Sequence, residues 1–216
     1  MVNIMFDERF RIAYDKSDEF LSRVDNTDGM ISIAEALDCA KRFYCPEIYL
    51  LQDSFKKLDI CDSYGAMMLA TFKPMLSTSS KSKKNSSDGN VSEIRATEAT
   101  IVLNSDKDVL YQRFSAFHEL GHLVAIDHNT AGKRYIAPNF IISTHINYNI
   151  TSISPKEYNE SNYLLNEQIA NIFALRVLMP TAIFYLKVRE LNNITLVAKF
   201  FGVTEDAVMS RMKVGA

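Results

Sequence analysis

The sequence predicts an α+β fold in which a small sheet lies beside one long apolar helix, between mostly helical N- and C-terminal parts. Two observations support this prediction. The run 65–72 is short, apolar and bounded by Gly65 and Pro74, and the run 99–104 is rich in β-branched residues. Both properties are typical of strands. The segments 104–126 and 162–179 are long and contain no proline, which favours helices. The chain has 216 residues, 47% of them hydrophobic, so it can bury a sizeable core and is not of the disordered class.

Residues 1–64 are predicted to form an N-terminal helical segment. Apolar residues at helical spacing predict a first helix that ends near the turn formers of 26–29. A second helix is predicted over 31–44, where the following proline stops it. Residues 47–59 are predicted to form a third, short helix.

Residues 65–180 are predicted to form the core of the protein. The polar stretch 77–92 separates the two predicted strands, and because it cannot supply packing surface we expect a mobile surface loop there. The second strand leads directly into the helix predicted over 104–126. The candidates for the N-cap of this helix are Asn104, Ser105 and Asp106.

The rest of the chain is predicted to be irregular at first and then helical. Residues 129–157 contain glycine, prolines and scattered apolar residues, with one strand expected at 140–143. The helix over 162–179 is ended by a proline. A C-terminal tail, 181–216, is predicted to contain two short helices around Gly202 and to resemble a helix-turn-helix.

Charge and cysteine content favour a cytoplasmic protein. The formal net charge is −2, so no overall positive field attracts the chain to nucleic acid or to an anionic membrane. The three cysteines, Cys39, Cys45 and Cys61, form no CxxC pair, and we interpret them as small buried side chains in a reducing compartment. Neither a secretory signal nor a membrane span is predicted from the sequence.

The segment HELGH at 118–122 is the most informative motif of the sequence. In a helix, His118 and His122 share one face, so both imidazoles can bind a single zinc ion. Glu119 is then placed to accept a proton from an attacking water and to return it to a leaving amine. Gly121 leaves room either for close packing or for the metal. The motif therefore predicts metal-assisted peptide hydrolysis.

A catalytic zinc site needs a third protein ligand, and spacing alone leaves two candidates. His128 would complete HExxHxxxxxH, although Ala125 stands where that pattern has the glycine that allows a sharp turn. Glu167 is the other candidate, since Asn171, one turn further along the same helix, could support a ligand histidine by a hydrogen bond.

These residues resemble the ImmA/IrrE family of metallopeptidases. The resemblance extends over roughly residues 30–214 and is strongest from residue 99 onward. The segments that carry it are Arg113-Phe114, HELGH at 118–122, EQIANIFA at 167–174, LMP at 178–180 and the ending LVAKFFGVTEDAVMSRM at 196–212.

The resemblance implies a zincin-like core, with a small antiparallel or mixed sheet beside the HExxH helix. It implies that zinc is bound by His118, His122 and Glu167, that Glu119 is the catalytic acid/base, and that His128 is not needed as a ligand. It further implies a cytoplasmic protease that cleaves a helix-turn-helix transcriptional repressor, and so relieves repression of a mobile element or a stress response.

Other hypotheses concern how partners bind. The strand at 99–103 is a candidate to hold substrate as an added strand. The helix-turn-helix-like tail would suit a DNA- or partner-binding regulator with weak or absent proteolysis, and Arg211 and Lys213 near its end would favour DNA. Against DNA binding, its second helix begins with Glu205 and Asp206, which would repel phosphates. Four side chains are candidate oxyanion donors: His145, Tyr158, Tyr163 and Arg176.

Overall fold

The computed structural model describes residues 10–24, 30–58, 64–74, 94–125, 140–145 and 160–214. Three of the four described strands follow one another, and helices are grouped before and after them, so the observed arrangement is compatible with the α+β class predicted from the sequence. The elements are α1 (Arg11–Arg23), α2 (Ile33–Phe43), β1 (Glu47–Asp53), β2 (Tyr64–Pro74), β3 (Ile94–Asn104), α3 (Val109–Ala125), β4 (Phe140–His145), α4 (Glu160–Leu178), α5 (Thr181–Leu191), α6 (Ile194–Phe201) and α7 (Glu205–Val214).

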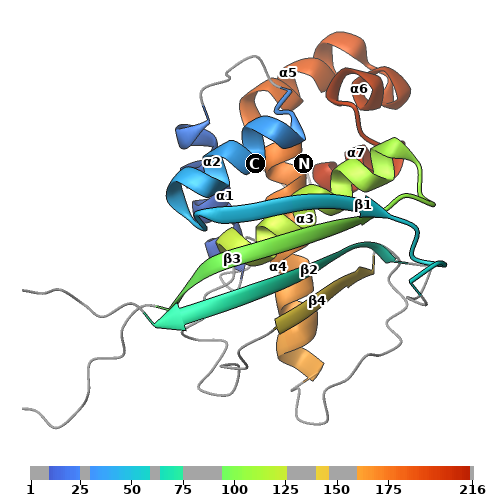
Figure 1. The fold of residues 1–216 in the computed structure, drawn as a ribbon. Helices are drawn as coiled ribbons and strands as arrows, with labels where there is room; N and C mark the ends of the chain where they lie inside the picture. The colour runs from blue at the N-terminus through green and yellow to red at the C-terminus, as the bar shows by residue number, and fades with distance from the viewer. Residues whose placement is uncertain are drawn as a thin grey trace, which may run out of the picture.

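The four described strands form one sheet in the order β1-β3-β2-β4 (Figure 1). β1 runs parallel to β3, whereas β2 is antiparallel to both β3 and β4. The open edges of the described sheet are therefore β1 and β4. The hypothesis that 99–103 accepts a substrate strand is wrong, because these residues lie in β3, which has a neighbour on both sides.

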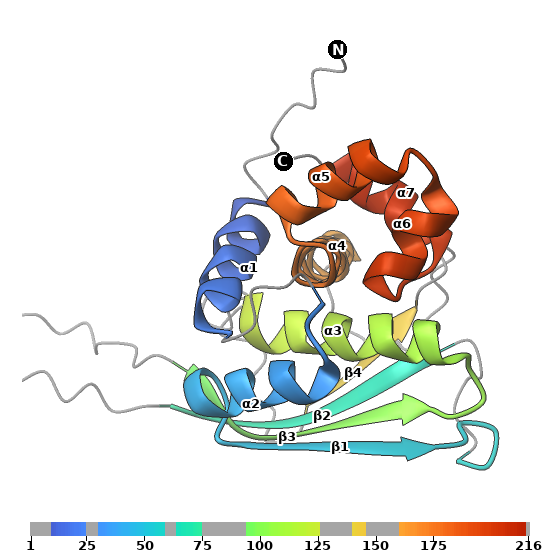
Figure 2. The same ribbon diagram turned by 90° about the horizontal axis from the view of Figure 1, so that it is seen from above.

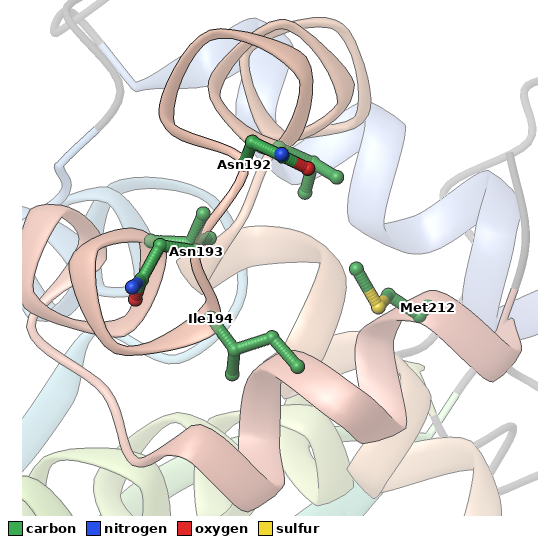
Figure 3. A pocket seen from close by; sticks show the side chains of 6 residues that line it. Asn192, Asn193, Ile194 and Met212 are labelled. Carbon is green, nitrogen blue, oxygen red and sulfur yellow. The ribbon is translucent and has the colours of Figure 1, made fainter.

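The helices lie on one face of the sheet in two layers (Figure 2). α2 and α3 contact the sheet, and α4 crosses over α3 on the side away from the strands. α1 and α7 then pack against α4. α3 is thus enclosed between the sheet and α4, and every residue from Ser115 to Ala125 is buried.

The start of α3 corrects one prediction. Its first turn is capped by Asp108, whose Oδ1 accepts hydrogen bonds from the backbone N–H groups of Leu110 (2.8 Å) and Tyr111 (3.1 Å). The expected cap residue Asn104 instead accepts from the N–H of Asp106 (3.0 Å) and holds the turn that follows β3. Asn104, Ser105 and Asp106 were wrong as caps because the chain makes this turn before the helix begins.

The prediction of a helix over 47–59 is also wrong, since Glu47–Asp53 is the strand β1. Only Ile48 of this strand is buried, and it lies beside Ala99 in the parallel pairing with β3. A run of four apolar residues, 48–51, has no clear period of its own, so pairing with a distant strand decides its conformation. This β1 segment lies within the predicted N-terminal part; the predicted division into three parts itself stays a prediction.

Most other predicted elements are confirmed within the described residues. Helices are present where the periods at 10–21, 31–44 and 162–179 predicted them, and strands at 65–72 and 99–104. The strand expected at 140–143 is also present as part of β4. The predicted loop 77–92 and most of the predicted irregular stretch 129–157 lie outside the described residues.

Two of the cysteines can be compared with the prediction. Cys39 and Cys45 are buried and free, as expected, while Cys61 lies outside the described residues. Burial raises the pKa of the Cys45 thiol to about 11, so at neutral pH this thiol is protonated and unreactive.

The C-terminal helices contain one element that the sequence analysis missed, α5. α6 and α7 agree with the prediction, and Gly202 between them adopts the left-handed conformation, φ 60°, that favours glycine. Arg211 of α7 is fully buried: its Nε donates to the carbonyl of Met179 (3.1 Å) and its Nη2 to Thr181 Oγ1 (2.8 Å). The guanidinium also lies 5.1 Å from the centre of the Phe184 ring. Arg211 thus fastens α7 to the junction of α4 and α5.

Among the described residues, no single helix is long and apolar enough to cross a bilayer. One helix pair, Leu165–Leu178 with Thr181–Leu191, passes by length and composition when its members are joined, and it is bent by 64°.

We predict that Arg211→Ala lowers the free energy of unfolding by about 2–4 kcal/mol, because it leaves the buried acceptor at Met179 without its charged donor. Urea unfolding followed by circular dichroism measures this change. Lys213→Ala is the control, since Lys213 is exposed on the same helix and its loss should change stability by less than about 0.5 kcal/mol. Equal effects of the two substitutions would contradict the fastening role of Arg211.

Candidate metal centre

Helix α3 places three polar side chains in the protein interior. His118 and Glu119 are fully buried, and His122 is 1% exposed. A surface helix that carries two histidines by coincidence would leave them in solvent, so this burial excludes that interpretation. Buried polar groups are costly unless they are paired with each other or with an ion, which makes their surroundings informative.

Helix α4 brings Glu167 to these histidines. His118 Nε2 lies 3.3 Å from Glu167 Oε2, and His122 Nε2 lies 3.3 Å from Glu167 Oε1. The two Nε2 atoms are 2.9 Å apart. Within the part of the chain that the structure describes, His118, His122 and Glu167 form the group of side chains that could hold a metal ion. His128, the alternative third ligand, lies outside the described residues.

The spacing of these three donors fits a metal ion. In a tetrahedral site with ligand distances of about 2.0–2.1 Å, neighbouring ligand atoms are about 3.3–3.4 Å apart. The two histidine-to-carboxylate distances of 3.3 Å agree with this value, and the distance of 2.9 Å between the two nitrogens is slightly shorter. Both carboxylate oxygens of Glu167 are buried without a hydrogen-bond donor among the described residues. A shared cation would satisfy all of these atoms at once.

Asn171 determines which nitrogen of His118 faces Glu167. Its Oδ1 lies 2.7 Å from His118 Nδ1. Because an amide oxygen can only accept a hydrogen bond, Nδ1 must carry the proton, which leaves the lone pair of Nε2 directed at the cluster. The contact expected from the sequence between Asn171 and a histidine of the motif is therefore present.

The electrostatics also suit a cation. Burial lowers the pKa of His122, so its imidazole is neutral at pH 7. Burial alone would raise the pKa of Glu167, but the two neighbouring histidines outweigh it and hold this pKa at about 2. A neutral imidazole and an ionised carboxylate are the forms that ligate metal ions.

Arg176, one of the candidate oxyanion donors, lies in the last turn of α4, whereas Glu167 lies near the middle of this helix. Its Nε donates to Ser17 Oγ (2.8 Å) and its Nη2 to Asp18 Oδ1 (2.8 Å), so its guanidinium ties α4 to α1. It does not belong to the metal cluster. Tyr158 and the side chains of His145 and Tyr163 lie outside the described residues.

Sequence reasoning missed the role of Arg113. Its Nη2 donates to the carbonyl of Ile31 (2.8 Å), and its guanidinium lies 5.6 Å from the centre of the Phe117 ring. This hydrogen bond connects α3 to Ile31, which lies just before the start of α2. An arginine directly before the apolar residue Phe114, in a helix predicted to lie in the core, is the signal that could have indicated such a contact.

A buried pair of histidines in HExxH spacing, joined by a carboxylate from a second helix, is a donor set of zinc hydrolases. Residues 73–213 match the family model described as the IrrE N-terminal-like domain, a peptidase family. This match covers well over half of the chain, and the chain belongs to that family, as the resemblance in the sequence implied. Searches of curated proteins and of solved structures find no significant match.

We predict that in metal-free protein His118 carries its proton on Nδ1, and that Asn171→Leu removes this preference because leucine offers no acceptor. Nitrogen-15 NMR of the imidazole rings distinguishes the two tautomers. Gln168→Leu, an exposed change on the same helix, should leave the His118 signals unchanged. An Nδ1-protonated His118 in the Asn171→Leu protein would contradict the assignment.

Proposed function

We propose that this chain is a zinc-dependent endopeptidase. The observation that carries the proposal is that one ligand atom from each of His118, His122 and Glu167 lies within 4.8 Å of the others, with Glu119 next to His118 in the sequence. Membership of a peptidase family supports it. In this proposal α3 and α4, packed beside the sheet, form the core of a zincin-like fold.

The proposed mechanism assigns each side chain one task. His118, His122 and Glu167 would hold a zinc ion, which when bound supplies Lewis acidity toward the scissile carbonyl and toward water. Glu119 accepts the proton of the attacking water and returns it to the leaving amine. Asn171 keeps the His118 ring in the orientation that directs Nε2 inward.

The proposed substrate is a helix-turn-helix transcriptional repressor, and the resemblance to the ImmA/IrrE family supports this choice. Of the two open edges of the described sheet, β4 packs against α3, whereas β1 packs against α2 and reaches α3 at Gln112, two turns before Glu119, through a hydrogen bond from Gln52. An extended segment of the substrate would therefore add to the backbone of β4, which would bring it near the helix that carries Glu119.

The alternative, direct DNA binding through the tail, is less well supported. Glu205 and Asp206 are exposed at the start of α7, where they would face phosphates. Arg211 is buried in internal contacts, which leaves Lys213 as the exposed cation of this helix. The exposed side chains of Leu196 and Met209 are better suited to packing or to a protein partner.

We predict that Glu119→Gln abolishes cleavage, by at least about a hundredfold, because glutamine cannot accept the proton. Zinc content should stay at the wild-type level, since Glu119 is not a proposed ligand. Cleavage is measured by gel electrophoresis and zinc by atomic absorption. An active Glu119→Gln protein would refute the assigned role of Glu119.

We predict that the zinc-loaded protein cuts a helix-turn-helix repressor encoded beside it, and that a chelator prevents the cut. Mass spectrometry of the products locates the cleaved bond. The Glu119→Gln protein incubated in parallel controls for contaminating proteases. A repressor that stays intact with zinc under all conditions tested would overturn the proposed substrate.

A further inference from the structure

Helices α3 and α4 approach each other closely at Gly121. A Cβ atom placed on Gly121 would lie 2.9 Å from Ala170 Cα and 2.9 Å from the Ala170 carbonyl oxygen, with Phe173 Cδ1 at 3.2 Å. Real Cβ atoms essentially never lie within 3.0 Å of such neighbours. Because the two nearest atoms belong to the backbone, a rotamer change cannot relieve the contact, and one helix would have to move.

This contact lies among the residues of the metal cluster. Gly121 directly precedes His122 and follows His118 by three positions. On α4, Ala170 follows Glu167 by three positions and directly precedes Asn171. Residues three apart on a helix lie on the same face, so this close backbone approach lies on the same faces of the two helices as the donor residues.

The need for glycine here is not conformational. Gly121 lies inside α3, and among the described glycines a positive φ occurs at Gly202. In a helix interior glycine destabilises by about 1 kcal/mol relative to alanine, so helix propensity alone would favour alanine at this position. The space left by the missing side chain is filled by α4 rather than by the metal cluster itself.

We propose that Gly121 is a positioning residue of the metal centre, which sets the separation of α3 and α4 so that the Glu167 carboxylate reaches both histidines. This inference rests on one part of the proposed function, namely that His118, His122 and Glu167 are the metal ligands. Ordinary van der Waals contacts of a Cβ begin at 3.4 Å, whereas a Cβ on Gly121 would lie 2.9 Å from the backbone of Ala170. Alanine at position 121 would therefore push the two helices apart by about 0.5 Å. Metal–ligand distances tolerate only about 0.2 Å, and the carboxylate would therefore leave its position.

The test compares the zinc affinity of four proteins by competition with a chromophoric chelator. Wild type is measured beside Gly121→Ala, Glu167→Ala and the double variant. We expect Gly121→Ala to weaken zinc binding at least about tenfold, which matches the effect of disturbing the support of a ligand. In the double variant we expect the same affinity as in Glu167→Ala, because Gly121 acts through that carboxylate.

Gly202→Ala is the matched control. It places a Cβ at φ 60°, where alanine is strained, but it lies in the turn between α6 and α7. We expect it to lower stability and to leave zinc affinity unchanged, so that a general loss of stability is distinguished from a displaced ligand.

Glu167→Asp is a second variant that avoids the clash. It keeps Gly121 but shortens the side chain by one methylene group, which moves the carboxylate away from the histidines. It should therefore weaken zinc binding, as Gly121→Ala does by separating the helices. Wild-type affinity in Gly121→Ala or in Glu167→Asp, or additive losses in the double variant, would overturn the inference. Wild-type affinity in Glu167→Ala would instead refute the proposed ligand set, which keeps the two failures distinct.

Discussion

The packing of α4 onto α3 is the contact on which the rest of this structure depends. α3 has the sheet on one side and α4 on the other, and eleven consecutive residues, Ser115–Ala125, are buried as a result. A helix enclosed in this way cannot turn its histidines toward solvent. It must satisfy them within the interface, and the side chains that do so, Glu167 and Asn171, both come from the opposing helix.

That arrangement carries an electrostatic cost. A carboxylate and two imidazoles occupy an interface otherwise built from residues such as Phe117 and Phe173. Both oxygens of Glu167 are buried without a hydrogen-bond donor among the described residues, and burial lowers the pKa of His122, so this neighbouring imidazole is neutral at pH 7. The contacts of Arg176 and Arg211 lie at the far end of α4, so this helix is fixed to α1 and α7 at a distance from its charged section.

The features that depend on spacing within a single helix were predictable from the sequence. The HELGH motif could be interpreted because its two histidines are spaced to share one helix face. Glu167 and Asn171 could be proposed because they have the same spacing on a second helix. β1 was not predictable, since a short apolar run becomes a strand here only by pairing with β3, about fifty residues later in the chain. Asp108 was missed as a cap because the turn held by Asn104 delays the helix by four residues. Spacing alone could not decide between His128 and Glu167, because the choice depends on which segment packs against α3.

The contacts of Arg211 bear on how the chain can be divided in the laboratory. This side chain reaches from the last helix to the carbonyl of Met179, directly after the helix that carries Glu167. The hydroxyl of Tyr14 in α1 also donates a hydrogen bond to the carbonyl of Val214, so the first and last described helices are joined. An expression fragment cut between α5 and α6 would lose both links and expose buried surface of α4, which makes the segment from α1 to α7 the smallest sensible unit for crystallisation.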